Sequence, residues 1–212
     1  MTVKSVVPTY TAAQVRAAEA PLLAAGVPLM KRAAAALAAV VAEHGPQTIL
    51  VLAGAGDNGG DALFAAAALA TQGIRVDLLR TADRVHDEAW TAALAAGAHE
   101  IVEPASSYGL VVDGILGIGA RGALRGRARE IVTLLLPLHP RVVAVDLPSG
   151  LDADDGASDG VVLPAETTVT FGAMKRGLAA RVDLAGRVIL VDLGLELTDP
   201  VGSAAVAEVR VG

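Results

Sequence analysis

Three segments of the sequence place glycines beside acidic, amide or hydroxyl side chains, each directly after a run of apolar residues. The first segment, GAGDNGGD, covers residues 54–61 and has four glycines within seven positions. Glycines let the backbone approach a ligand closely, and amides at a helix N-terminus can bind a phosphate group. The pattern G-x-G-x-x-G after a predicted strand is typical of dinucleotide binding. The alternative is a tight turn that only needs positive φ.

The other two segments add charged groups. Residues 112–126 (VDGILGIGARGALRG) carry Arg121 and Arg125, with Arg127 just beyond, and these guanidinium groups can either bind phosphate or remain solvated. The third segment, VDLPSGLD, begins at residue 145, and its Asp146 ends an apolar strand. A buried carboxylate is costly unless it is paired or functional, which makes Asp146 the best acid/base candidate. Its alternative role is to cap the following turn.

The elements that position these segments follow from the apolar pattern. After two N-terminal helices, at about 12–25 and 29–43 with Thr11 as the first N-cap, short β-branched runs alternate with Ala-rich stretches. We predict strands at 48–53, 74–79, 100–103, 110–113, 142–146, 168–171 and 188–192, with helices at 60–71, 84–96 and 127–136. The fold class is α/β, a three-layer αβα Rossmann-like fold with a mostly parallel sheet. In such a sheet ligands bind beyond the carboxyl ends of the strands.

We expect one domain over residues 1–212, with N-terminal helices in 1–45, a βαβ core in 46–200 and a tail in 201–212. The formal net charge of −6 argues against nucleic acid and anionic membranes as partners. The chain has no cysteine, which excludes disulfides and thiolate chemistry. The longest apolar run, 33–42, is about half of a membrane span, and the N-terminus does not resemble a signal peptide. We therefore expect a cytoplasmic protein.

Taken together, the three segments resemble the YjeF N-terminal family. Its strands end in G-x-G-N-N-G-G-D, D-x-L-x-G-T-G and D-x-P-S-G-L-D, where this chain reads GAGDNGGD, DGILGIG and DLPSGLD. Leu29 and Met30, the run TVTFG at 168–172, Lys175 and Gly177 match as well. The chain departs from the family at Asp57, which stands in place of an Asn, and at positions 31–32, where Lys-Arg replaces Glu-Asn.

The resemblance implies an NAD(P)H-hydrate epimerase, an isomerase that interconverts the R and S forms of hydrated NADH or NADPH in metabolite repair. It implies a bound K⁺ with Asn58, Asp113 and Ser149 as ligands, and oxygen donors of this kind suit a hard cation. The implied substrate contacts are Asp57, Asn58, Gly59, Gly60, Asp61, Gly117, Ile118, Gly119, Ala120, Arg121, Gly122, Ala123 and Asp146. We predict Asp146 as the main acid/base residue, assisted by Lys175.

Two alternatives remain open. A nicotinamide-dependent dehydrogenase would place an acid at the end of the second strand, where this chain has Leu79-Arg80-Thr81. A non-catalytic nucleotide-binding or scaffold module is expected to lose the cation ligands or the aspartate of D-x-P-S-G, and this chain keeps them. The apolar N-terminal helices and the resemblance also predict a homodimer, and the repair reaction can involve a dehydratase on a separate chain.

Overall fold

An eight-stranded sheet forms the centre of the protein in the computed structural model, which describes residues 5–105, 107–119 and 123–212. The strand order is β11-β9-β7-β6-β5-β2-β3-β4, and every pairing in it is parallel. The strands are β2 (Thr48–Ala53), β3 (Arg75–Arg80), β4 (His99–Ile101), β5 (Leu110–Gly114), β6 (Val142–Val145), β7 (Thr167–Phe171), β9 (Arg187–Asp192) and β11 (Glu208–Val211).

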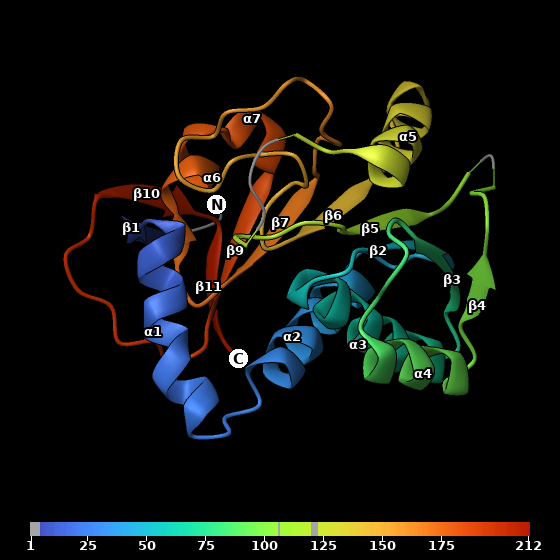
Figure 1. The fold of residues 1–212 in the computed structure, drawn as a ribbon, viewed down its shortest axis with the longest axis horizontal. Coiled ribbons are helices and arrows are strands. Elements are labelled where there is room, and N and C mark those ends of the chain that lie inside the picture. Colours follow the sequence, from blue (N-terminus) through green and yellow to red (C-terminus); the bar gives the residue numbers. More distant parts are fainter. Residues whose placement is uncertain (1–4, 106, 120–122) are drawn as a thin grey trace.

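Helices cover both faces of this sheet, as Figure 1 shows. On one face lie α2 (Leu29–Glu43), α3 (Asp57–Thr71) and α4 (Asp87–Ala95). On the other lie α5 (Gly126–Leu135), followed by the 3₁₀ turn η1 (Leu136–Leu138), and the short helices α6 (Arg176–Ala180) and α7 (Val182–Ala185). The three-layer αβα architecture predicted from the sequence is therefore confirmed.

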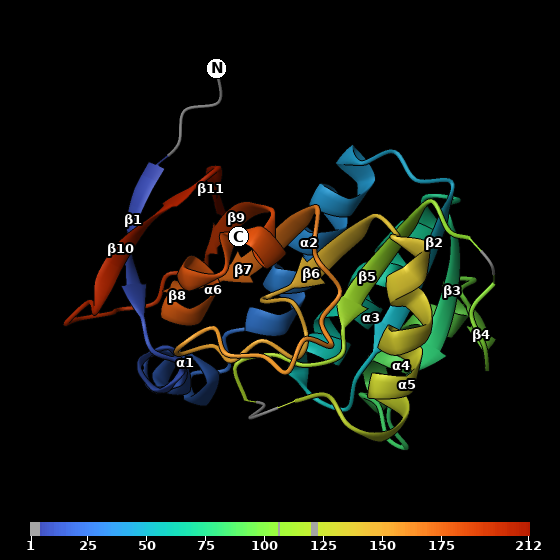
Figure 2. The same cartoon turned by 90° about the horizontal axis from the view of Figure 1, so that it is seen from above.

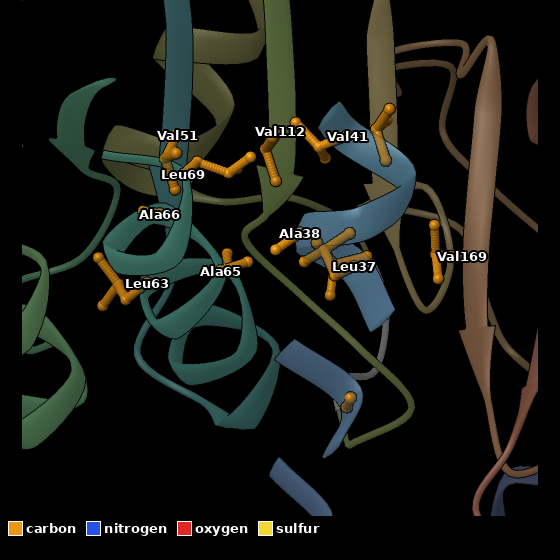
Figure 3. Packing of buried hydrophobic residues seen from close by; sticks show 14 of the residues in the cluster. Leu37, Ala38, Val41, Val51, Leu63, Ala65, Ala66, Leu69, Val112 and Val169 are labelled. Carbon is orange, nitrogen blue, oxygen red and sulfur yellow. The ribbon is translucent and has the colours of Figure 1, made fainter. Parts of the chain in front are cut away.

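Small aliphatic side chains fill the core, because the chain has only 2% aromatic residues. In Figure 3, Leu37, Ala38 and Val41 of α2 and Ala65 and Leu69 of α3 pack against the strands. Burying one large apolar side chain stabilises the folded state by roughly 1.5–3 kcal/mol. Several alanines on α2 and α3 let these helices lie close to each other and to the sheet, which brings the start of α3 near the ends of β2 and β5.

The helix α1 (Ala12–Ala24) lies at one end of the molecule, beside a second, smaller sheet (Figure 2). A capping box at its start joins Thr11 and Gln14, which confirms Thr11 as the N-cap. No single helix in the described residues is long and apolar enough to cross a bilayer. The helices α1 and α2 meet that criterion only jointly, and they are bent by 115° from each other.

The structure corrects the prediction that residues 201–212 form a tail. They contain β10 (Gly202–Val206) and β11, and β10 belongs to the smaller sheet with β1 (Ser5–Tyr10) and β8 (Met174–Lys175) in the order β10-β1-β8. The sequence did not predict these strands because β1 and β10 are short and half exposed. In addition, β1 includes a proline and pairs with residues about two hundred positions away, so no local pattern identifies it.

Candidate active site

A cavity of about 760 Å³ opens at the carboxyl edge of the large sheet. Its walls come from the segments that follow β2, β3, β5, β6 and β9, together with the end of β7 and parts of α1, α2 and α5. The polar side chains that line it are Glu19, Asp57, Asn58, Asp61, Thr81, Arg125 and Asp146. Its size lies within the range of small-molecule and cofactor sites, so the position expected for a parallel sheet holds a space of suitable volume.

The first glycine segment begins a helix earlier than predicted. The helix α3 starts at Asp57, not at residue 60, and has Gly56 as its N-cap. None of the four glycines in this segment has positive φ, which excludes the tight-turn interpretation. A Cβ on Gly54 would lie 1.9 Å from the Ile115 carbonyl oxygen, and one on Gly59 would lie 2.1 Å from that of Gly54. These glycines are needed because β2, α3 and the segment after β5 approach closely.

Asp146 lies directly after β6 with φ of 68°, a left-handed conformation that Asp tolerates better than most residues. It is 4% exposed, and one of its carboxylate oxygens, Oδ1, accepts hydrogen bonds from three donors. The donors are the Thr170 hydroxyl (3.1 Å), the Phe171 amide (3.3 Å) and the Lys175 ammonium. We call Asp146, Thr170 and Lys175 the Asp146 cluster.

Lys175 is 1% exposed and also donates to the Thr170 hydroxyl (3.1 Å) and the Phe171 carbonyl (2.8 Å). It therefore has three oxygen partners and forms a buried ion pair with Asp146. Lys175 does not line the cavity, whereas Asp146 does. The structure thus brings together the two residues predicted for catalysis, and Lys175 can act on a ligand only through Asp146.

A second buried carboxylate lies below the cavity. Asp113, at the end of β5, is 0% exposed and accepts hydrogen bonds from the Ser149 hydroxyl (2.6 Å) and the Ser149 amide (2.9 Å). Burial raises the pKa of the Asp113 carboxyl, while these bonds and one from the Ile115 amide act against the rise. The Leu116 amide donates to the Ser149 hydroxyl (2.9 Å).

Asn58 completes this group. Its side-chain Nδ2 donates to the carbonyl oxygens of Leu116 (3.0 Å) and Val145 (2.6 Å). A Cβ on Gly117 would lie 2.3 Å from the Asn58 Oδ1 atom, so a glycine is required for this close packing. We call Asn58, Asp113 and Ser149 the Asp113 cluster. The three residues predicted as cation ligands from the resemblance therefore lie together.

Two further acids of the cavity have raised pKa values. Asp61, in the first turns of α3, is 7% exposed, and burial raises the pKa of its carboxyl well above the usual value, reinforced by the charges of Asp146, Asp57 and Glu19. Burial likewise raises the pKa of Glu19 in α1, although Lys175 acts in the opposite direction. The cavity wall thus concentrates carboxyl groups, and the buried Lys175 pairs with one of them, Asp146.

Most of the predicted substrate contacts line the cavity. These are Asp57, Asn58, Asp61, Gly117, Ile118, Gly119, Ala123 and Asp146. Gly59 and Gly60 do not, because they are buried in α3, where a Cβ on Gly60 would lie 2.8 Å from the Met30 sulfur. Ala120, Arg121 and Gly122 lie outside the described residues. Of the other predicted phosphate ligands, Arg125 lines the cavity, whereas Arg127 donates to the Val102 carbonyl away from it.

Sequence reasoning missed the contribution of the N-terminal helices to the cavity wall. Glu19 and Leu23 come from α1, and Leu29, Met30 and Ala33 from α2. Arg16 of α1 donates to the Ile118 carbonyl (2.6 Å), and the Asp154 carboxylate accepts from the Ala12 amide (2.7 Å). These contacts join residues more than one hundred positions apart, so periodicity could not reveal them.

Lys31 and Arg32, which depart from the family pattern, contact other segments of the protein. Arg32 donates to the carbonyl oxygens of Gly212 (2.7 Å) and Leu193 (3.0 Å), which fixes α2 to the end of the chain. Lys31 pairs with Glu88 at 3.0 Å and lies over the Phe64 ring. Asp57, the third departure, is exposed at the start of α3 and lines the cavity.

Comparison with known proteins extends these observations. The chain is 57% identical to the "NAD(P)H-hydrate epimerase" of Microbacterium testaceum (strain StLB037), with 96% of this chain and 87% of that protein covered. It is 52% identical to the protein of the same name from Clavibacter michiganensis subsp. michiganensis (89% and 91% covered). It is 40% identical to the "Bifunctional NAD(P)H-hydrate repair enzyme Nnr" of Mycobacterium tuberculosis (strain ATCC 25618 / H37Rv), of which it covers 44%.

A solved structure shares the fold. The crystal structure of yeast YNL200c matches with a TM-score of 0.73 at 19% identity, over 85% of this chain and 89% of the yeast chain. The family model described as "YjeF-related protein N-terminus" matches residues 26–177, which include all three glycine-containing segments and Lys175. The family expected from those segments is confirmed, and the chain belongs to the YjeF-related N-terminal family.

Proposed function

We propose that this chain is an NAD(P)H-hydrate epimerase, an isomerase that interconverts the R and S forms of hydrated NADH and NADPH. The observation that carries the proposal is the Asp146 cluster: a buried carboxylate, ion-paired with a buried lysine, on the wall of a cavity of about 760 Å³. The relatives named NAD(P)H-hydrate epimerase, which match nearly the whole chain, support it. A nicotinamide-dependent dehydrogenase is less favoured, because β3 is followed by Thr81 and Ala82 where such enzymes hold the ribose with an acid.

The substrate carries a hydroxyl on the ring carbon next to the ring nitrogen. Inversion can proceed when this hydroxyl takes up a proton and leaves as water, while the nitrogen lone pair forms a C=N bond. A water molecule then adds to the opposite face of that carbon and gives up a proton. Oδ1 of Asp146 is held by three donors, so the carboxylate is positioned to accept this proton without reorientation.

The remaining cavity residues suit the nucleotide part of the substrate. The first amides of α3 are aligned with the positive end of the helix dipole, and the segment after β5 adds Gly117 and Gly119. Arg125, at the N-cap of α5, supplies a guanidinium group on the opposite wall. These groups offset the acidic side chains of the cavity where phosphates are expected to bind.

We further propose that the Asp113 cluster holds K⁺. The donor set fits a hard monovalent cation. The Asn58 amide lies beside the Leu116 and Val145 carbonyl oxygens, and the Ser149 hydroxyl contacts both the Leu116 carbonyl and the Asp113 carboxylate. The Asn58 amide must turn to present its oxygen, since its nitrogen now faces those carbonyls. A bound cation would supply positive charge beneath the nucleotide. No group of three or more His, Cys, Asp or Glu side chains suited to a metal occurs among the described residues.

The direct test is to incubate the protein with one purified epimer of the NADH hydrate and to follow the appearance of the other by chromatography. We expect equilibration of the two epimers with no change in redox state. If NADH is oxidised, the dehydrogenase alternative replaces this proposal. If the epimer stays unchanged while the protein binds it, the chain is a binding module.

We also propose a homodimer. The exposed apolar residues Val6 (73% exposed) and Leu23 (59%) lie in β1 and α1 at one end of the molecule, where a second copy can cover them. Sedimentation at micromolar concentration is expected to give a dimer, and a monomer alone contradicts this. We also propose that the protein works alongside a dehydratase, in line with the bifunctional repair-enzyme relative. The cytoplasmic location stays a prediction.

A further inference from the structure

We propose that Asp61 is a second acid/base residue of the epimerisation and gives a proton to the departing hydroxyl while Asp146 accepts one from the returning water. This role rests on the proposed function. It assigns a specific chemical task to a side chain that the sequence placed only among the substrate contacts.

Asp61 combines deep burial with an unpartnered oxygen. Its side chain lines the cavity, although the residue as a whole is only 7% exposed. Its Oδ1 atom is buried and has no hydrogen-bond partner within the described residues. A buried polar atom without a partner is costly, so an unpartnered carboxyl oxygen in a residue that lines a ligand cavity indicates that a ligand, or a proton, completes this carboxyl group.

The surroundings of Asp61 and Asp146 differ as expected for a proton donor and a proton acceptor. Three donors, one of them Lys175, hold Oδ1 of Asp146, so the other oxygen of this carboxylate, which accepts no hydrogen bond within the described residues, can take up a proton. No such donor reaches Oδ1 of Asp61, and the charged groups around it are mostly negative. These are Asp57 on the same helix, Glu19 on α1 and Asp146 after β6, opposed by Lys175 on β8. Burial and these charges raise the pKa of Asp61 well above its usual value, which favours the protonated carboxyl.

The proton balance closes over one turnover. Protonated Asp61 gives its proton to the hydroxyl, the C–O bond breaks, and water leaves as the ring nitrogen forms its double bond. Water adds to the other face, and its extra proton passes to the Asp146 carboxylate. The enzyme then holds the proton on Asp146, and it returns to its starting state by exchange with solvent or by catalysing the reverse reaction. No electrons are transferred, and the only bonds changed on the substrate are those at one carbon.

The test is Asp61→Asn, with Asp77→Asn as the matched control. Among the described residues, Asp77 is the other buried carboxyl with an oxygen that accepts no hydrogen bond. This oxygen lies 3.5 Å from Arg75 Nε, and Asp77 lies in β3 outside the cavity. Asn keeps the shape and a hydrogen-bond donor but cannot transfer a proton. We expect D61N to lower kcat by about a hundredfold with KM within a few fold, and to remove the fall in rate that the wild type shows as pH rises through the raised pKa of Asp61. D77N should keep wild-type kcat and its pH profile.

Stability supplies a readout independent of activity. Because the pKa of Asp61 is raised in the folded protein, protonation of this carboxyl stabilises the folded state. This contribution is fully present below about pH 4, the pKa of Asp61 in the unfolded chain, and is lost as pH rises through the folded-state pKa. The free energy of unfolding of D61N relative to wild type should therefore increase with pH above about 4. A difference that does not change with pH, or D61N with wild-type kcat, overturns the proposal, as does a rise in KM alone. If the wild type fails to interconvert the epimers, the proposed function fails first and this role with it.

Discussion

The Asp146 cluster and the Asp113 cluster are two buried carboxylate sites at the same sheet edge, but their charges are balanced differently. Asp146 is paired with the ammonium of Lys175, whereas Asp113 accepts hydrogen bonds, within the part of the chain that the structure describes, from the hydroxyl and amide of Ser149 and from the Ile115 amide, all neutral donors. When a buried carboxylate is paired with a cation from its own chain, its charge is balanced without a ligand. One held only by neutral donors gains from a cation supplied by solvent. This difference is consistent with the two roles proposed for these sites, proton transfer at Asp146 and cation binding at Asp113.

The largest effect is expected when the ammonium group of Lys175 is removed. Lys175→Met should lower the free energy of unfolding by about 3–5 kcal/mol, because it leaves the Asp146 carboxylate buried and unpaired. Chemical denaturation at neutral pH measures this loss. The neighbouring exposed Arg176→Met is the control and should cost less than about 1 kcal/mol. A K175M protein as stable as wild type would show that the ion pair does not balance the cluster.

The next effect concerns Asp146 itself. Asp146→Asn keeps the side-chain shape, and Asn also tolerates the left-handed backbone at this position. Epimerisation should slow by about a hundredfold or more, while nucleotide binding stays within a few fold. Single-turnover kinetics and calorimetric titration separate the two quantities. A rate near that of wild type would contradict an acid/base role for Asp146 and leave Asp61 or a bound water as the leading candidate.

The smallest effect is expected in the Asp113 cluster. Asp113→Ala should weaken nucleotide binding by about tenfold and abolish any dependence on K⁺, since it removes the only charged ligand of the proposed cation. Titrations in potassium chloride and in choline chloride at equal ionic strength make the measurement. Ser149→Ala removes a neutral donor and should have a weaker effect in the same direction. Unchanged affinity without potassium dependence would contradict the cation site.

The sequence predicted the parts of the molecule whose signals are local. The strand at 48–53 was predicted with the bounds that β2 has, because an apolar run between Gly-Pro and a glycine segment leaves little freedom. The start of α3 was missed by three residues, since glycines at its first turn suggested a loop. The role of those glycines also differs from the turn interpretation, because the close approach of Ile115 to Gly54 depends on tertiary packing.

Within the candidate site, the type of each residue was predictable but its surroundings were not. Asp146 could be selected as an acid that ends an apolar strand, and Lys175 through the family resemblance. That Lys175 lies behind Asp146 rather than in the cavity depends on the position of β8, which the sequence did not reveal. Glu19 lacks any local signal, because it reaches the cavity only through the contacts of α1 with distant segments.

The strand pairing of the smaller sheet bears on the order in which parts of the chain fold. Lys175 pairs in register with Tyr10 of β1, and β1 in turn pairs with β10 near the other end of the sequence. The loop that this pairing closes spans almost the whole chain, and closing long loops is slow. The smaller sheet, which includes the strand that carries Lys175, is therefore expected to form later in folding than the large sheet, whose neighbouring strands are mostly closer together in sequence.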